Sequence, residues 1–206
     1  MASAPGRLIA LEGIDGCGKS TQARLLADRL GALLTFEPGA TALGRSLRTL
    51  LLDPGQPAVA ERSEALLMAA DRAQHVAEVV RPALDRGEWV VTDRFSASTL
   101  AYQGYGRGLD LEELGQLVEW ATGGLAPDLS VLVDVEPALG LARRAGAEQD
   151  RMEREGGGFG RRVAEGYRCL AEQQATPWLV VDGRGAVDEV AALVWAGVRD
   201  RLGGLS

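Results

Sequence analysis

The glycine-rich stretch at residues 13–20 constrains the fold more than any other part of the sequence. It reads GIDGCGKS and fits the pattern G-x-x-x-x-G-K-[ST]. An apolar segment, residues 7–13, leads into it, and an amphipathic segment from Thr21 to Leu30 follows it. In a strand–loop–helix setting, such glycines let consecutive backbone N–H groups converge on phosphate oxygens, and the helix N-terminus adds its dipole. The stretch therefore predicts a phosphate-binding loop between a buried strand and a helix.

Lys19, inside this loop, is the only lysine of the chain, because the other 21 of the 22 basic residues are arginine. A compact ammonium group fits a narrow phosphate-binding loop, whereas a planar guanidinium is bulkier and directs its donors differently. A single lysine would fall in this position by chance only about once in two hundred placements. We therefore expect Lys19 to contact the β- and γ-phosphates of a nucleotide, and the Ser20 hydroxyl to bind Mg²⁺. The expected nucleotide-contacting residues of the loop are Gly13, Ile14, Asp15, Gly16, Cys17, Gly18, Lys19, Ser20 and Thr21.

Short apolar runs alternate with longer amphipathic stretches along the chain. The expected strands are residues 7–13, 33–37, 89–93, 129–135 and 178–183. The expected helices are residues 21–30, 43–52, 61–85, 111–122, 161–174 and 187–202. Continuous apolar runs are typical of strands buried on both faces, and their alternation with helices implies a mostly parallel sheet. We predict an α/β fold of the P-loop NTPase type, a three-layer α/β/α sandwich with a five-stranded parallel sheet. No linker or repeat divides the chain, so we expect one domain over residues 1–206.

Two stretches interrupt this alternation. Residues 53–58 read DPGQPA, a proline–glycine turn, and residues 143–162 contain six arginines, four acidic residues and the glycine run 156–158. On charge alone, the second stretch is typical of a solvated loop with a glycine hinge.

Composition excludes several classes of partner. The formal net charge of −7 and a pI near 4.9 leave no broad basic surface for a nucleic-acid polymer. No apolar run reaches the roughly 18 to 20 residues of a membrane span, and residues 1–6 lack the features of a secretory signal, so we expect no membrane partner and a cytoplasmic protein. Cys17 and Cys169 are expected to be free thiols. The absence of asparagine disfavours the protein-kinase arrangement, which needs an Asn ligand.

Four motifs, in order, carry a resemblance to a known family. They are EGIDGCGKST at 12–21, EPGATALGRSLRTLLL at 37–52, LLMAADRAQHVAEVVRPAL at 66–84 and TDRFSASTLAYQGYGRG at 92–108. Together they resemble thymidylate kinase, the enzyme that phosphorylates dTMP to dTDP with ATP and Mg²⁺. The likeness runs from about residue 7 to the end of the chain. It implies ATP and dTMP as the nucleotide partners and a homodimer.

The resemblance implies a role for each matching position at the acceptor site. Asp15 is expected to accept a hydrogen bond from the 3′-hydroxyl of dTMP, Arg94 to bind the acceptor phosphate with Arg48 nearby, and Asp93 to hold a magnesium-bound water. Arg72 and Gln103 match positions that hydrogen-bond the thymine edge, with Thr99 beside them, and Tyr102 should pack on the deoxyribose. The full acceptor set is Asp15, Glu37, Arg48, Met68, Arg72, Arg94, Ser98, Thr99, Tyr102 and Gln103.

With this resemblance, the charged stretch is interpreted as an arginine-bearing lid over the phosphates, about residues 143–160. Arg151 is the leading candidate for the arginine that reaches the transferring phosphate, and Arg143 and Arg154 follow it. Arg184 lies in the loop expected to border adenine. Phosphoryl transfer depends mostly on positioning and charge neutralisation, so no catalytic histidine is needed and His75 is interpreted as a packing or surface residue. The expected catalytic residues are Lys19, Asp93, Arg94 and Arg151; Arg143 and Arg184 complete the ATP set, and Ser20 and Asp93 the metal set.

Three positions depart from the family pattern. Met68 stands where the family usually has a phenylalanine that stacks on thymine, so base selectivity is expected to differ. Phe36 and Ala40 replace an arginine and a glycine around the EPG motif. Two alternatives stay open at this point: another nucleoside monophosphate or deoxynucleoside kinase, and a non-catalytic nucleotide-binding switch, which would need no acceptor pocket.

Overall fold

A computed structural model describes residues 6–145, 152, 157–173 and 177–203. Within them, five parallel strands form one sheet in the order β2-β3-β1-β4-β5. The strands are β1 Leu8–Glu12, β2 Leu33–Phe36, β3 Val90–Asp93, β4 Leu129–Asp134 and β5 Trp178–Asp182. The predicted five-stranded parallel sheet is therefore confirmed, and each strand lies within one or two residues of its expected bounds.

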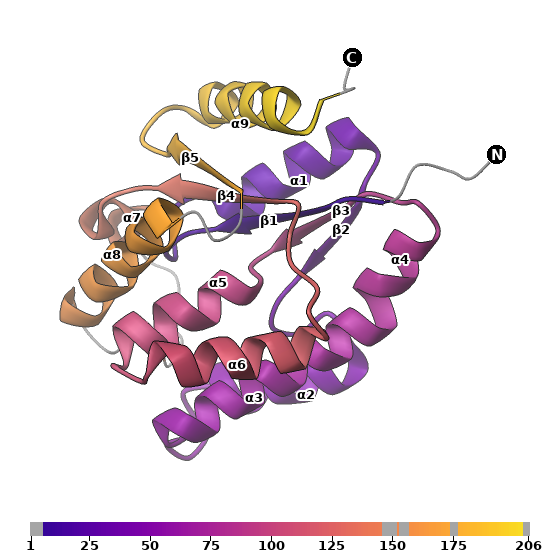
Figure 1. Ribbon diagram of the computed structural model, residues 1–206. Coiled ribbons are helices and arrows are strands. Elements are labelled where there is room, and N and C mark those ends of the chain that lie inside the picture. Colours follow the sequence, from indigo (N-terminus) through magenta and orange to yellow (C-terminus); the bar gives the residue numbers. More distant parts are fainter. Residues whose placement is uncertain (1–5, 146–151, 153–156, 174–176, 204–206) are drawn as a thin grey trace.

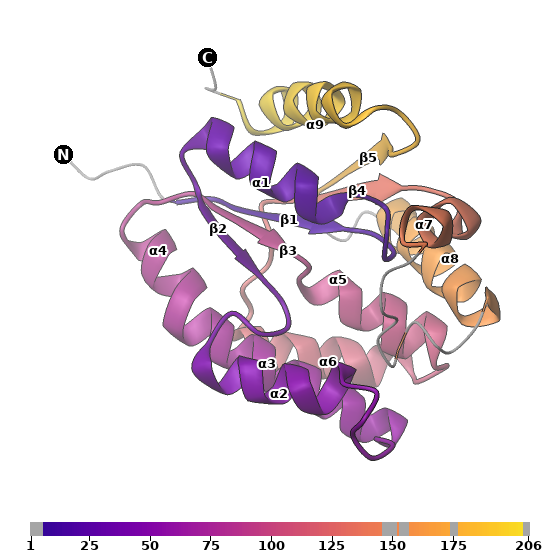
Figure 2. The ribbon, with the colours of Figure 1, turned by 180° about the vertical axis from the view of Figure 1, so that it is seen from behind.

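Helices cover both faces of this sheet (Figures 1 and 2). The described helices are α1 Lys19–Leu30, α2 Ala42–Leu52, α3 Glu61–His75, η1 Val76–Val80, α4 Arg81–Asp85, α5 Ser96–Thr99, η2 Leu100–Gly106, α6 Leu111–Thr122, α7 Pro137–Arg143, α8 Gly157–Gln173 and α9 Val187–Leu202. Helices α1 and α9 pack together on one face, whereas α5, α8 and the segment from α3 to α4 lie on the other. This is the predicted three-layer arrangement. Among the described residues, no helix combines the length and apolar character needed to cross a bilayer.

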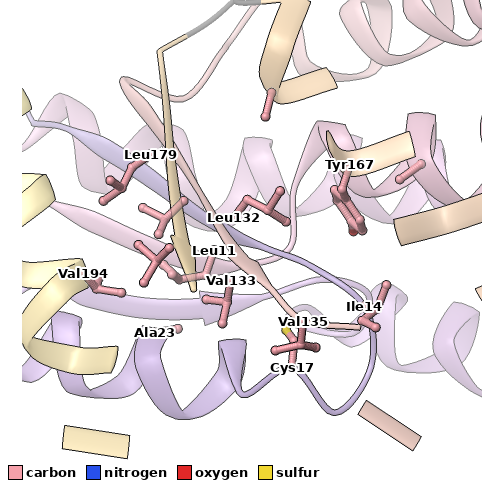
Figure 3. Close-up of a cluster of buried hydrophobic side chains, with 14 of the residues drawn as sticks. Leu11, Ile14, Cys17, Ala23, Leu132, Val133, Val135, Tyr167, Leu179 and Val194 are labelled. Atoms are coloured by element: carbon pink, nitrogen blue, oxygen red, sulfur yellow. The ribbon is translucent and has the colours of Figure 1, made fainter. Parts of the chain in front are cut away.

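The central strand β1 is fully buried along its length, with the apolar residues Leu8, Ile9, Ala10 and Leu11 facing the two helical layers in turn. Figure 3 shows the layer shared with α1 and α9, where Leu11 and Val133 lie near Ala23 and Val194. The same cluster extends to Cys17 in the glycine-rich loop. Burial of such apolar surface contributes roughly 25 cal/mol per Å², so this core fixes the loop firmly against the sheet.

Three helical features differ from the sequence expectation. The stretch 61–85 is helical throughout, but residues 76–80 form a wider π-type turn in which the Arg81 N–H donates to Val76 O. Pro82 lacks an N–H, and its ring would clash with the carbonyl four residues earlier, which accounts for the local widening. Segments α5–η2 and α7 were not predicted. Helix α8 starts at Gly157, four residues before the expected start at Arg161, so residues 157–160 of the expected lid are helical.

Candidate active site

The glycine-rich loop has the backbone conformation that only glycine adopts without strain. Gly13, Gly16 and Gly18 have φ values of 142°, 79° and 98°. A Cβ added at Gly16 would lie 2.1 Å from the Gly140 carbonyl oxygen, so the loop packs directly on α7. Gly18 is the N-cap of α1, and no side chain caps the helix there. The N-terminal N–H groups of α1 are therefore available to an anion.

Lys19 is buried at the start of α1. Its Nζ donates to the Ile14 carbonyl and to Asp15 Oδ1, both at 3.3 Å. Ser20 is exposed on the same turn, and Thr21 is partly buried beside it. The ammonium group is thus held inside the loop by weak, long contacts that phosphate oxygens could replace.

Asp15 contacts both Lys19 of this loop and Arg94, the residue that follows strand β3. Arg94, directly after β3, donates from Nη2 to Asp15 Oδ1 at 2.5 Å, and the Tyr102 hydroxyl donates to Asp15 Oδ2 at 2.8 Å. Burial alone would raise the pKa of Asp15, but the charges of Arg94 and Lys19 hold it well below its usual range. Asp15 is therefore an anionic acceptor between the nucleotide loop and the neighbouring pocket.

A pocket opens beside Asp15, with about 610 Å³ of space that includes its solvent-facing mouth. All members of the predicted acceptor set line it: Asp15, Glu37, Arg48, Met68, Arg72, Arg94, Ser98, Thr99, Tyr102 and Gln103. Pro38, Leu52, Asp71 and Met152 complete the lining. The pocket has the mixture of apolar and convergent polar groups typical of a small-molecule site.

Arg72, a buried residue of α3, crosses the inner wall of the pocket. Its Nε donates to Glu37 Oε2 at 2.8 Å, its Nη1 to the Thr99 hydroxyl at 2.8 Å, and its Nη2 to the Phe95 carbonyl at 3.0 Å. These three bonds fix the plane of the guanidinium. Because a guanidinium carries five N–H donors, two remain for a ligand or for other acceptors.

Glu37 is supported from behind by His75. The fully buried imidazole lies 2.8 Å from Glu37 Oε1 through Nδ1 and 2.7 Å from the Thr35 hydroxyl through Nε2. His75 is thus a buried packing residue, as interpreted, with both ring nitrogens hydrogen-bonded. Asp71, which the sequence analysis did not single out, accepts from the Gly39 N–H at 3.0 Å, and burial together with the charge of Glu37 raises its pKa to about 6.

Gln103 has a defined amide orientation. Its Nε2 donates to Glu64 Oε1 at 3.0 Å, and Arg107 binds the same carboxylate at 3.0 Å. This bond uses one of the two Nε2 hydrogens and leaves the amide oxygen as the acceptor that can meet a ligand in the pocket.

Met68, on α3, and Arg48, on α2, both line the pocket. Met68 is partly buried, packs against the main core and lines the pocket, so it is not a core residue alone. Arg48, on α2, donates from Nη1 to the Pro38 carbonyl at 2.8 Å. Phe36, another of the three departures from the family pattern, is largely exposed at the end of β2 and does not line the pocket.

Arg143, the last residue of α7, connects the two loops expected to bind ATP. It donates to the Cys17 carbonyl at 3.4 Å, the Gly183 carbonyl at 2.9 Å and the Arg184 carbonyl at 3.3 Å. The Arg184 side chain instead turns to Asp182, at 2.6 Å, on the exposed surface. Arg143 therefore acts here as a bridge between backbone segments.

The remaining lid arginines, Arg151 and Arg154, lie outside the described residues. Met152, between them, is described, is buried and lines the pocket.

The expected metal positions fit a hydrated Mg²⁺. Asp93 ends β3 near the loop, and its Oδ1 is buried without a hydrogen-bond partner among the described residues. An orphaned buried carboxylate oxygen needs a donor, and a water on a cation provides one. Ser20 is exposed at the start of α1 and can present its hydroxyl to the same ion.

Sequence reasoning missed Glu12, the last residue of β1. Its carboxylate is completely buried and accepts from the Phe95 N–H at 2.9 Å, the Ser98 hydroxyl at 2.6 Å and the Tyr167 hydroxyl at 3.2 Å. Burial raises the pKa of Glu12 to about 7, although the Ser98 hydrogen bond and the charge of Arg94 oppose this shift. A single carboxylate in an otherwise apolar strand was the available signal, because buried charges need specific partners.

Comparisons with known proteins agree with this geometry. A family model described as thymidylate kinase matches residues 11–194. A protein named thymidylate kinase from Synechococcus sp. strain CC9902 is 49% identical over 208 residues, covering 96% of this chain and 99% of the relative. One from Carboxydothermus hydrogenoformans is 50% identical over 191 residues, covering 90% and 93%. The crystal structure of thymidylate kinase from Ehrlichia chaffeensis superposes with a TM-score of 0.77 at 31% identity, over 94% of this chain and 99% of that one. The chain therefore belongs to the thymidylate kinase family.

Proposed function

We propose that this protein transfers the γ-phosphoryl group of ATP to dTMP, forming dTDP. One observation carries the proposal: the whole predicted acceptor set lines one pocket, and Asp15 joins that pocket to the lysine of the phosphate-binding loop. The names of the relatives, thymidylate kinase, support the same assignment. A switch protein would need no second pocket of this kind, so the non-catalytic alternative is not favoured.

The residues perform this reaction by alignment and charge neutralisation. Two nucleotide phosphates repel each other, and cationic groups placed at both offset that repulsion as the reacting oxygens line up. Lys19 serves the donor phosphates, and Arg94 with Arg48 serves the acceptor phosphate. Asp93 and Ser20 would hold Mg²⁺, which when bound supplies further neutralisation of the donor phosphates.

The base end of the pocket favours thymine over cytosine. Gln103 offers its amide oxygen as an acceptor, because one of its Nε2 hydrogens is held by Glu64, and Arg72 offers donors. Thymine presents an N3–H donor next to the O4 acceptor, which matches this pair. Cytosine presents an N3 acceptor next to an amino donor, so buried polar groups of the site would be left unpaired, which is costly.

Further parts of the proposal concern the lid, the domain and the assembly. We assign residues 143–160 as the lid, with Arg151 as the arginine that reaches the transferring phosphate. We propose one domain over the chain, a cytoplasmic location where ATP and dTMP occur together, and a homodimer. Exposed apolar side chains on the neighbouring helices α2, α3 and α6 support the homodimer: Leu43, Leu50, Leu66 and Trp120.

A coupled assay of ADP formation tests the function directly. Purified protein receives ATP and Mg²⁺ with dTMP, dUMP, dCMP, AMP, thymidine or no acceptor. We expect the fastest turnover with dTMP and little with dCMP, AMP or thymidine. Equal turnover in all reactions would contradict the acceptor assignment, and turnover with thymidine alone would indicate a deoxynucleoside kinase.

Two variants separate the donor and acceptor roles in this assay. Arg94→Ala should lose dTMP turnover chiefly through a higher KM for dTMP, because the acceptor phosphate loses its partner. Lys19→Ala should reduce turnover with every acceptor, because it acts on ATP. Full dTMP turnover by Arg94→Ala would show that its assigned role is wrong.

A further inference from the structure

Glu12 makes a network that the phosphoryl-transfer chemistry does not itself require. It lies at the carboxyl end of the central strand β1 with no exposed surface. Its Oε1 accepts from the Phe95 N–H, and its Oε2 accepts from the hydroxyls of Ser98 and Tyr167. A buried carboxylate is costly unless such partners surround it, so its presence calls for a reason beyond packing.

The two hydroxyls that bind Glu12 also bind Arg94. Arg94 Nη1 lies 3.2 Å from Ser98 Oγ and 3.1 Å from the Tyr167 hydroxyl oxygen. Each hydroxyl carries one proton, and the two oxygens lie 2.8 Å apart, so the Ser98 proton goes to Glu12 and the Tyr167 proton lies between Glu12 and Ser98 Oγ. Their lone pairs are then left facing the guanidinium of Arg94, which only donates.

Arg94 needs this support because its backbone is unusual. It has a φ of 74°, the only positive φ of a non-glycine residue in the described part of the chain. Strained positions of this kind persist where surrounding contacts hold them, and they concentrate at functional sites. The Nη2 group meets Asp15 and Tyr102, while Nη1 meets the two hydroxyls.

We propose that Glu12 is a positioning residue for the acceptor phosphate, acting on Arg94 through the hydroxyls of Ser98 and Tyr167. This inference rests on the proposed function, because it takes Arg94 as the phosphate-binding arginine. No residue of β1 or α8 lines the pocket. The inference gives both elements a shared role in positioning Arg94, through the contact between Glu12 and Tyr167.

The substitution Glu12→Gln tests the orientation of the hydroxyls. The amide is nearly the same size, but its NH₂ group donates where Oε2 accepted. The hydroxyls then accept from it, one of them can still donate to the other, and the remaining proton turns toward Arg94. The substitution Tyr167→Phe removes one of the two hydroxyls while keeping the ring, and it provides the same test if Glu12→Gln does not fold.

The measurement is calorimetric binding of dTMP and of thymidine, which lacks the phosphate. We expect Glu12→Gln to weaken dTMP binding by about tenfold, as for loss of a charge-assisted contact, and to change thymidine binding less than about twofold. Tyr167→Phe should act in the same direction, and the double variant should lose less than the product of the two single effects, because both act on one network. Ser130→Ala, at a buried polar position of β4 away from Arg94, is the matched control and should change neither ligand.

Each other outcome overturns the inference. Equal weakening of dTMP and thymidine would make Glu12 a general support of the fold, and unchanged dTMP binding would separate it from Arg94. In steady-state kinetics the KM for dTMP should rise while the KM for ATP stays constant, and a rise in both would also count against the role. The proposed function is checked first, on the unsubstituted protein. If that protein did not phosphorylate dTMP, the proposed function would be wrong, whatever the variants show about Glu12.

Discussion

At the residue scale, Met68 is the pocket residue that is expected to depart from the family pattern. It lines the pocket beside the groups expected to bind the base, where an aromatic ring would stack on thymine. We expect Met68→Phe to lower the KM for dTMP roughly two- to fivefold, because an aromatic pair contributes more than a sulfur contact. Steady-state kinetics at saturating ATP measure this.

Met68→Leu is the matched control for that substitution. It conserves volume and removes the sulfur without adding a ring, so the KM for dTMP should not fall. An unchanged or higher KM for Met68→Phe would mean that the side chain supports the pocket wall instead of facing the base.

Asp71 makes the stability of the protein depend on pH. Its pKa is raised from 3.8 to about 6 by burial and by Glu37, so between these values the folded chain keeps a proton that the unfolded chain has released. Stability contributed by this group is therefore lost as pH rises from about 4 to 6, by roughly 2 to 3 kcal/mol at most. Asp71→Asn keeps an acceptor for the Gly39 N–H and removes the titration.

We therefore expect the melting temperature of Asp71→Asn, relative to the unsubstituted protein, to increase between pH 4 and pH 7. Thermal unfolding followed by circular dichroism across that range measures it. Ser63→Ala, at an exposed position of α3 that carries no ionisable group, should show a constant difference. A constant difference for Asp71→Asn as well would show that its carboxyl group does not titrate in this window.

Sequence motifs predicted residues that line the pocket but not the residues behind them. Lys19 and Arg94 lie in motifs whose residue types and spacing predict a binding role. Glu12 and Tyr167, by contrast, are 155 positions apart and meet only because α8 packs beside β1. The resemblance assigns roles to pocket positions, whereas such supporting contacts depend on tertiary packing, which no local pattern records.

At the scale of elements, the short helix α7 is the main feature that the sequence did not predict. It has seven residues, begins with proline and lacks the repeated apolar spacing of a long amphipathic helix. Yet Gly140 packs on the phosphate-binding loop, and Arg143 joins that loop to the loop after β5. The segments α5 and η2 were also not predicted. The motif at residues 92–108 indicated a function, but it does not show the apolar spacing typical of a helix.

Arg143 therefore offers a prediction about ATP that is independent of the acceptor. Arg143→Ala should raise the KM for ATP by about fivefold or more, because two loops lose a shared hydrogen-bonding partner, and should leave the KM for dTMP within about twofold. Arg24→Ala, an exposed arginine of α1, is the control and should change neither constant. An equal rise in the KM for ATP and the KM for dTMP would contradict this, because it would mean that Arg143 supports both nucleotide sites.

At the scale of the whole molecule, strand order determines where the site lies. Strand β1 is central, with β3 on one side and β4 on the other, so the loop after β1 adjoins the carboxyl ends of both neighbours. Ligands in open parallel sheets bind at such a position. The alternation of strands and helices predicted a parallel sheet but not its order, because several orders fit the same alternation.

The same arrangement leaves α2, α3 and α6 side by side, on the opposite side of the molecule from α9 (Figures 1 and 2). Trp120, on α6, is 82% exposed, and Leu50 and Leu66 are exposed on α2 and α3. Large apolar side chains that gather on one surface favour association, since water is released when they are covered. This supports the proposed homodimer through these three helices.

The homodimer is tested by sedimentation velocity at several protein concentrations. We expect the unsubstituted protein to sediment as a dimer, and Trp120→Glu to shift toward monomer because a buried, unpaired carboxylate opposes association. Leu193→Glu is the matched control: Leu193 is 53% exposed on α9, away from the three helices, so its variant should remain dimeric. Dimers of Trp120→Glu at every concentration would place the interface elsewhere, and a monomeric unsubstituted protein would refute the assembly. Because all residues assigned to the pocket come from one chain, we expect any monomeric variant to retain dTMP binding, and calorimetry on Trp120→Glu separates assembly from ligand recognition.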